Sequence, residues 1–176
     1  MKKMILIGSG GSGKSTLARK LGELLSIEVH HLDARLWRPD WVAVPKAEQI
    51  TIQDELISRD RWIIDGNYGG TLDRRIKAAD TIIFVDLSRW ICLYRVLKRR
   101  FRHRHTKRID MAEGCEERIT LDFMRWVWAY PSKHRPKIMK QLMELSTEKT
   151  IIVLKTRGEV RTFLERIERE ASWRQH

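Results

Sequence analysis

The chain has 176 residues, of which 42% are hydrophobic, and this size and composition suit one folded domain and exclude an intrinsically disordered chain. The net charge of +12 suits a polyanionic partner, nucleotides or nucleic acid, although solubility combined with a phosphate-binding site is the simpler explanation. No apolar run approaches the roughly 18 residues of a membrane-spanning helix, and the two cysteines, Cys92 and Cys115, lack disulfide or metal-ligand spacing, so we expect a cytoplasmic protein.

The predicted elements alternate between strand and helix. Residues 4–7 (MILI) mimic the apolar run of a signal peptide but lead straight into a glycine loop, so we predict a buried strand there. Apolar spacing and the glycines and prolines predict the other elements. The first half holds a helix from Lys14, a strand at 27–32 ending at Asp33, a loop at 35–45, a helix opened by Pro45, a strand at 62–65, a short helix through 74–76 and a strand at 81–87. The second half holds a basic helix at 88–102, an aperiodic segment at 103–115, helices at 117–130 (ending before Pro131) and 136–145, a strand at 150–154 and a helix from Gly158.

The predicted strands are rich in Ile and Val, show no polar alternation and are joined by helices. This pattern is typical of a parallel sheet covered on both faces, and it predicts one doubly wound α/β domain with a five-stranded sheet. Ligands of such sheets bind at the carboxyl ends of the strands. The candidate active site therefore consists of the residues found at those ends: 8–15, Asp33, 65–67, Asp86 and 156–157.

Residues 8–16 read GSGGSGKST and fit the phosphate-loop pattern G-x-x-x-x-G-K-[ST]. The glycines let backbone N–H groups point inward around phosphates, and the following helix adds the positive end of its dipole. Lys14 should reach the β- and γ-phosphates and Ser15 should ligate Mg²⁺; a flexible turn or a dinucleotide loop is the disfavoured alternative. The predicted phosphate-binding residues are Gly8, Ser9, Gly10, Gly11, Ser12, Gly13, Lys14, Ser15 and Thr16.

Two aspartates follow neighbouring predicted strands. Asp65 precedes Gly66, a context that favours a carboxylate serving Mg²⁺ over a turn residue. Asp33 could accept a proton from an acceptor hydroxyl or orient it, or it could simply be a loop or N-cap residue. His30 and His31 precede Asp33, and because strand side chains alternate we expect at most one of them to face the site and both to be packed.

A basic run begins in the predicted helix at 88–102, where Arg95 and Arg99 lie four residues apart and share a face. Two guanidiniums on a mobile segment could clamp phosphoryl charge, so we predict a lid at about 95–115. A solvated helix face is the alternative, and a nucleic-acid patch stays open. Phe101 is the only aromatic residue among these charges, so the run offers little surface on which the bases of a single-stranded nucleic acid could stack.

Taken together, GSGGSGKST, IIDGNY, the pair Arg95 and Arg99, and LKTRGEV resemble the adenylate-kinase-like P-loop kinases over essentially the whole chain. The resemblance implies the nucleoside-monophosphate-kinase-like fold, ATP phosphates on residues 8–15 and Asp65 near Mg²⁺. It further implies that Arg95 and Arg99 are lid arginines and that Thr156 and Arg157 contact adenine. The absence of an N-K-x-D tetrad also favours adenine over guanine.

A narrower resemblance is to the bacterial DNA topology modulation proteins (FlaR-related), which are predicted small kinases. It is carried by HLDARLW, WIIDGNYGGTLD, FVDLSRWICLYRVLKRR, DMAEGCEER and FMRWVWAYP. True adenylate kinases follow the Asp-Gly pair with phenylalanine, proline and an arginine that grips the acceptor nucleotide. Here Asn67-Tyr68-Gly69-Gly70 stand in that place, which favours a small hydroxylated acceptor such as a nucleoside. Four arginines would instead suit an acceptor that already carries phosphate: Arg35, Arg38, Arg74 and Arg75.

The sequence therefore predicts an Mg-ATP-dependent phosphotransferase, monomeric or homodimeric, with Lys14, Asp33, Arg95 and Arg99 as catalytic residues. Its predicted acceptor-binding residues are Asp33, Trp37, Asn67 and Arg74. The alternative is a nucleotide-binding, DNA-associated regulator without small-molecule kinase activity.

Overall fold

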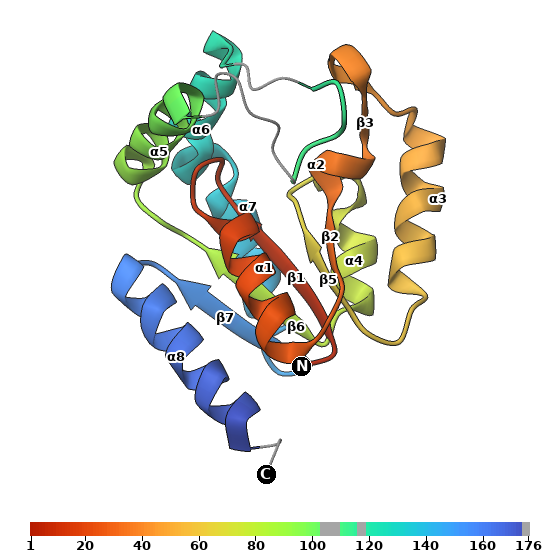
Figure 1. Cartoon of the computed structure of the whole chain (residues 1–176), viewed down its shortest axis with the longest axis vertical. Coiled ribbons are helices and arrows are strands. Elements are labelled where there is room, and N and C mark those ends of the chain that lie inside the picture. The colour runs from red at the N-terminus through yellow and green to blue at the C-terminus, as the bar shows by residue number, and fades with distance from the viewer. Residues whose placement is uncertain (103–109, 116–118, 174–176) are drawn as a thin grey trace.

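The computed structural model describes residues 1–102, 110–115 and 119–173. Five parallel strands form one sheet, in the order β2 (Val29–His31), β5 (Trp62–Asp65), β1 (Lys3–Gly8), β6 (Thr81–Val85) and β7 (Thr150–Leu154). Figure 1 shows the strands running in one direction, with the turn between β1 and α1 at their carboxyl edge. The prediction of a five-stranded parallel sheet is confirmed.

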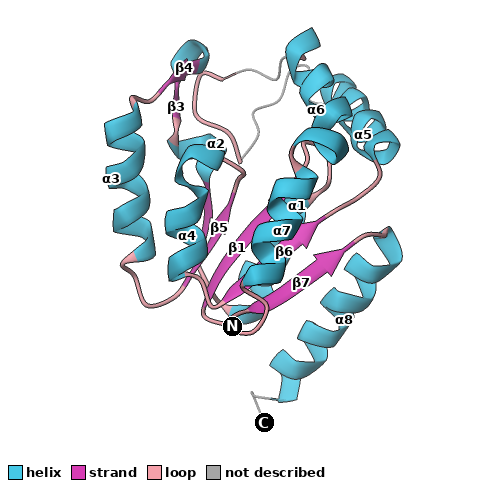
Figure 2. Cartoon of the chain, turned by 180° about the vertical axis from the view of Figure 1, so that it is seen from behind, coloured by secondary structure: helices cyan, strands magenta, loops and turns pink. Residues whose placement is uncertain are grey.

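Helices cover both faces of the sheet (Figure 2). Successive side chains of β1 point to opposite faces, so Met4 and Leu6 enter one apolar cluster while Ile5 and Ile7 enter the other. The first cluster is completed by α1 (Lys14–Leu25), α5 (Arg89–Arg102) and α8 (Arg157–Trp173). The second is completed by α3 (Lys46–Ile57), α4 (Leu72–Ala78) and α7 (Arg135–Glu144). The helix α6 (Leu121–Lys133) contributes to both clusters, through Val127 and Tyr130.

The segment predicted as a loop at 35–45 is more regular than expected. The short helix α2 (Leu32–Arg35) follows β2 directly, so Asp33 lies in the first turn of a helix and not at the end of a strand. A small antiparallel hairpin then pairs β3 (Trp37–Arg38) with β4 (Val42–Ala43) around the 3-10 turn η1 (Pro39–Trp41). A second 3-10 turn, η2 (Gly69–Thr71), precedes α4.

The helix expected to end before Pro131 continues through it to Lys133. Proline removes its own backbone donor from the ladder and crowds the carbonyl group one turn back, yet the ladder continues after it, because His134 N donates to Tyr130 O at 3.0 Å. Tyr130 is buried in the same apolar cluster as Leu142 of α7, and this packing stabilises the last turn. The prediction of a helix end at Tyr130 was therefore wrong.

The predicted lid segment falls into two described parts. Residues 95–102 belong to α5, which is anchored in the core by Cys92 and Val96. Residues 110–115 lie against the β3–β4 hairpin (Figure 1), where Asp40 N donates to Gly114 O at 3.2 Å and Cys115 Sγ donates to Arg38 O at 3.2 Å. Residues 103–109, which include the predicted lid cations Arg104, Lys107 and Arg108, lie outside the described part of the chain.

None of the helices in the described ranges combines the length and the apolar composition that crossing a bilayer would require.

Candidate active site

The phosphate loop connects β1 to α1 and is shaped by its glycines. Gly11 has φ of 77°, and a side chain there would collide with the carbonyl oxygen of Cys92 on α5. A glycine is required at this position for both reasons, because the left-handed region is costly for other residues and no space exists for a Cβ. Gly13 precedes α1 with φ of 94°, and Leu17 N donates to Gly13 O at 3.0 Å.

The start of α1 has unsatisfied donors. Among residues 1–102, 110–115 and 119–173 no side chain caps the helix at Gly13, so its first backbone N–H groups have neither an intrahelical partner nor a capping oxygen from these residues. The hydroxyl of Ser12 is buried and makes no hydrogen bond to any residue that the structure describes. Orphan donors at the positive end of a helix dipole suit a phosphate group. The loop therefore fits the polyphosphate that its sequence pattern predicts.

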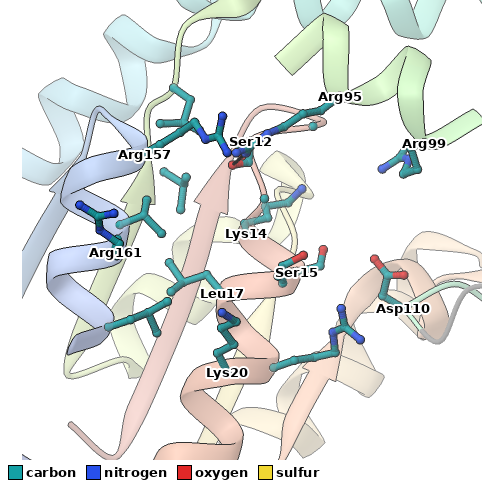
Figure 3. A pocket seen from close by; sticks show the side chains of 18 residues that line it. Ser12, Lys14, Ser15, Leu17, Lys20, Arg95, Arg99, Asp110, Arg157 and Arg161 are labelled. Carbon is teal, nitrogen blue, oxygen red and sulfur yellow. Dashed lines mark hydrogen bonds between the residues drawn. The ribbon is translucent and has the colours of Figure 1, made fainter. Parts of the chain in front are cut away.

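A cavity of about 560 Å³ opens beside this loop and is bounded by α1, α5 and α8. Figure 3 shows Lys14, Arg95, Arg99 and Arg157 around the loop. Among the described lining residues only Asp110 is acidic, whereas the basic ones are Lys14, Arg19, Lys20, Arg95, Arg99, Arg157 and Arg161. So strong an excess of positive charge in one hollow favours a polyanionic ligand.

The predicted lid arginines both line this cavity. Arg95 is half-buried, and its Nη1 donates to the carbonyl oxygen of Ser12 at 2.9 Å, so it is joined to the loop. Burial, and after it the positive charge of Arg157, lower the pKa of Arg95 below the ordinary value of an arginine. An anion placed between the two guanidiniums would relieve this repulsion.

Thr156 and Arg157, the two residues predicted to contact adenine, differ in their surroundings. Arg157 lines the cavity. Thr156 caps α8: Glu159 N donates to Thr156 Oγ1 at 3.1 Å, and Lys155 N donates to Glu159 Oε2 at 2.8 Å. This arrangement is close to a capping box and engages the threonine hydroxyl in the fold. An adenine contact from Thr156 stays a prediction.

Asp65 ends β5 with its carboxyl group buried against His31. Its Oδ2 lies 2.9 Å from His31 Nδ1, while its Oδ1 is buried and makes no hydrogen bond within the described part of the chain. The pair forms because β2 lies next to β5 with His31 opposite Asp65. An ionised carboxylate with one oriented oxygen and one orphan oxygen can serve a divalent cation or its water shell. Sequence reasoning foresaw a packed His31 but not this partner.

Asn67 makes two hydrogen bonds to the backbone of Gly8. Gly8 N donates to Asn67 Oδ1 at 3.0 Å, and Asn67 Nδ2 donates to Gly8 O at 2.7 Å. The side chain therefore ties the segment after β5 to the first residue of the phosphate loop. A substrate contact from Asn67 stays a prediction, alongside this structural role.

Arg75 is fully buried and organises the same segment. Its Nη1 donates to Gly66 O at 2.7 Å, and its Nη2 donates to Asn67 O at 2.7 Å and to Tyr68 O at 3.2 Å. Burial lowers the pKa of Arg75 to about 10, so it stays charged at neutral pH. The sequence predicts that Arg75 could bind an acceptor that carries phosphate, because nothing in the local pattern distinguishes Arg75 from Arg74.

Tyr68 connects two of the four predicted acceptor-binding residues, Asp33 and Trp37. Its hydroxyl donates to Asp33 Oδ1 at 2.8 Å and accepts from Trp37 Nε1 at 2.8 Å. Burial raises the pKa of Tyr68 well above its ordinary value, and the charge of Asp33 raises it further. Tyr68 is therefore a permanent hydrogen-bond donor to Asp33. Sequence reasoning missed Tyr68, and only its place two residues after the Asp-Gly turn could have indicated it.

Arg74 points to α3, where its Nη1 donates to both oxygens of Asp54 at 3.0 and 2.9 Å. Arg38 likewise donates to Glu48 Oε2 at 2.6 Å. Both pairs are about half exposed, and such pairs contribute little to stability. The acceptor contact predicted for Arg74 stays a prediction, from a side chain that already has a carboxylate partner.

No family model and no curated protein matches the chain. Solved structures do match. Shikimate kinase from Acinetobacter baumannii, in complex with shikimate, is 18% identical at a TM-score of 0.59, over 95% of this chain and 90% of that one. Deoxyadenosine kinase from M. mycoides, with dCMP and dCDP, is 14% identical at 0.52, over 96% and 97%. A gluconokinase from Sinorhizobium meliloti is 14% identical at 0.51, over 99% and 98%.

At these identities the likeness establishes the fold. The chain has the α/β fold of the nucleoside-monophosphate-kinase-like P-loop NTPases, with the parallel sheet order β2-β5-β1-β6-β7.

Proposed function

We propose that the protein is a phosphotransferase that moves the γ-phosphoryl group of Mg-ATP to a hydroxyl group of a small acceptor. One observation carries the proposal: the start of α1, which has no side-chain cap within the described residues, opens into a cavity whose described charged residues are all basic except Asp110. The solved kinases of the same fold, named for shikimate, deoxyadenosine and gluconate, support an acceptor of small size.

On the donor side, the loop amides and Lys14 would hold the β- and γ-phosphates, and Arg95 and Arg99 would neutralise charge on the transferring group. Arg157 lines the same cavity and would contact the nucleoside part of ATP. Most of this catalysis is positioning and electrostatic stabilisation, so no reactive side chain is needed.

The residues present also fit a magnesium ion. Ser15 lies in the first turn of α1 and lines the cavity, and Asp65 offers a buried oxygen that makes no hydrogen bond to the described residues. When bound, Mg²⁺ would neutralise phosphate charge and favour transfer. In this chain Ser15 would hold the ion directly and Asp65 would orient its water shell.

On the acceptor side, Asp33 Oδ2 would bind the acceptor hydroxyl while Tyr68 holds Oδ1. The hydroxyl oxygen forms a bond to the γ-phosphorus as the bond from that phosphorus to the β,γ-bridging oxygen breaks, which gives ADP and a phosphate ester. The hydroxyl proton passes to Asp33 or, if Asp33 only orients the hydroxyl, to water. Asn67 and Tyr68 are adjacent, so the loop and the acceptor carboxylate are linked through two residues.

The test is a transfer screen with Mg-ATP against nucleosides, nucleotides and small hydroxylated metabolites, in which each phosphorylated product is detected directly. Lys14→Met should abolish transfer, and Lys140→Met, which removes an exposed lysine of α7, should leave it unchanged. Formation of ADP from water alone, with no phosphorylated acceptor in any reaction, would contradict the proposal.

A second candidate, the DNA-associated regulator, is favoured by one surface. Trp90, Tyr94 and Phe101 are 68%, 63% and 80% exposed on α5, and Lys98 Nζ lies 5.9 Å from the centre of the Tyr94 ring. The spacing of four and seven residues puts the three rings on one face, so the stacking platform is larger than the sequence indicated. The affinity of this surface for a DNA strand should then fall steeply as the salt concentration rises. Two results together would favour this function over the kinase. The protein would bind DNA tightly at physiological salt even as the Lys14→Met variant, and the transfer screen would yield no phosphorylated acceptor.

A further inference from the structure

The acceptor side of the site is built around one pinned carboxylate. Asp33 is half-buried, and Tyr68 occupies its Oδ1. Within the described residues, no hydrogen bond is made by its Oδ2. The carboxylate therefore offers one oriented oxygen to a hydroxyl donor, and its negative charge disfavours an anionic acceptor.

The arginines that could compensate an anionic acceptor have other partners. Arg35 Nη2 lies 3.2 Å from His30 Nδ1, and Arg75 is buried against backbone carbonyls. Arg38 and Arg74 are paired with carboxylates of α3. A phosphate or carboxylate that drew on one of these arginines would have to displace its present partner while lying near the charge of Asp33. An uncharged acceptor displaces no partner of these arginines and is not repelled by the charge of Asp33.

Aromatic rings form the other part of this region. Trp37 is held by its hydrogen bond to Tyr68, and its ring packs edge-on against Trp41 with 5.5 Å between the ring centres. Trp37 is half-buried, so part of this residue is exposed to solvent. An oriented indole ring beside a hydrogen-bonding carboxylate suits a ligand that carries both a planar ring and a hydroxyl group.

We propose that the phosphate acceptor is an uncharged, hydroxylated molecule with a planar ring, the chemical class to which nucleosides belong. Trp37 binds its ring, Asp33 binds its hydroxyl group, and Tyr68 is the positioning residue that fixes both. This inference rests on the proposed kinase function and selects among its acceptors. It favours a neutral acceptor over one that already carries phosphate.

The experiment compares three probes in the Mg-ATP transfer assay: a set of nucleosides, their 5′-monophosphates, and ribose, which lacks the planar ring. We expect kcat/KM for the best nucleoside to exceed that for its monophosphate and for ribose at least tenfold. A monophosphate or ribose preferred over every nucleoside would overturn this inference and leave the kinase function standing. Transfer to none of the probes or of the wider metabolite screen would instead contradict the kinase function.

Variants separate the residue roles. Trp37→Ala should raise KM for the nucleoside at least tenfold with KM for ATP unchanged, and Trp37→Phe, which keeps a ring, should recover part of that loss. Tyr68→Phe should lower kcat more than it changes KM for ATP, because Asp33 loses its orienting donor. Trp173→Ala, which removes an 84% exposed tryptophan at the end of α8, is the matched control. If Trp37→Ala still bound ATP and its KM for the nucleoside were unchanged, Trp37 would not be the residue that binds the ring of the acceptor.

Discussion

The side-chain amide of Asn67 is hydrogen-bonded to both backbone polar groups of Gly8, at 3.0 and 2.7 Å. This contact joins residues that are 59 positions apart, the first residue of the phosphate loop and the segment that also carries Tyr68. The loop is therefore not an independent module in this protein. Its first glycine is held by the same segment whose Tyr68 donates a hydrogen bond to Asp33, the proposed acceptor-binding carboxylate.

Replacing Asn67 should weaken nucleotide binding without a change in any residue that touches the nucleotide. In Asn67→Ala both Gly8 groups lose their partner, and a partly buried unpaired group costs about 1–3 kcal/mol. We expect about a tenfold loss of ATP affinity, measured by calorimetry, together with a lower unfolding midpoint. Gln141→Ala, which removes an exposed hydrogen bond to Asp73, is the control. Equal ATP affinity in both variants would show that nucleotide binding does not depend on the hydrogen bonds between Asn67 and Gly8.

Neighbouring arginines of α4 should differ strongly in their effect on stability. Arg75→Met leaves three backbone carbonyls without their donor in a buried place, and we expect a loss of about 3 kcal/mol in the free energy of unfolding. Arg74→Met removes only an exposed ion pair and should cost less than about 1 kcal/mol. Urea denaturation of both variants measures the difference. A similar loss for the two would contradict the structural role of Arg75, and an increased acceptor KM in Arg74→Met would support its predicted acceptor contact.

His31 should matter for magnesium through Asp65. The Nδ1 atom of His31 orients the carboxylate at 2.9 Å, and residues that orient metal-serving carboxylates typically contribute 10–100-fold to affinity. We expect His31→Leu to reduce the gain in ATP affinity that Mg²⁺ provides, by about tenfold, with metal-free ATP binding unchanged. His31→Asn can still donate a hydrogen bond and should recover much of the gain. Calorimetric titrations of ATP with and without Mg²⁺ decide; an equal magnesium effect in the Leu and Asn variants would exclude a role for the contact.

The sheet and the loop could be predicted from the sequence because both depend on local patterns. Four-residue apolar runs such as MILI and WIID predict buried strands wherever they lie, and the phosphate-loop pattern is contiguous. The β3–β4 hairpin could not be found this way, since its strands are two residues long and its turn contains Asp40 at a positive φ. Such a segment has no periodicity to detect.

The contacts within the site depend on strand order, which no local pattern states. Because β5 lies between β1 and β2, the segment after Asp65 reaches both Gly8 and Asp33. From the sequence, Asp33 and Asp65 could be assigned to the same edge of the sheet. The partners Tyr68, His31 and Arg75 could not, because each is fixed by the packing of elements that are distant along the chain.

Stability should fall on mild acidification because of His30. This side chain is fully buried, and Arg35 Nη2, which can only donate, lies 3.2 Å from its Nδ1, so protonation would add an N–H group that faces a guanidinium and would place a positive charge in the interior. Burial lowers its pKa to about 4 from the ordinary 6.5; Glu28 opposes this shift, while Arg35, Arg59 and His31 add to it. Between these two values the unfolded chain binds a proton that the folded chain does not, so the free energy of unfolding decreases as pH falls through this window.

The full effect, from above pH 6.5 to about pH 4, amounts to roughly 3 kcal/mol. Urea denaturation at pH 7.5, 6 and 5 would measure it. We expect His30→Gln, which cannot be protonated in this range, to lose less stability between pH 7.5 and 5 than the parent chain. His134→Gln replaces an exposed histidine and should keep the parental pH dependence. If the three proteins lost stability in parallel, other groups would have to account for the acid sensitivity, because only the His30 variant lacks a buried imidazole at this position.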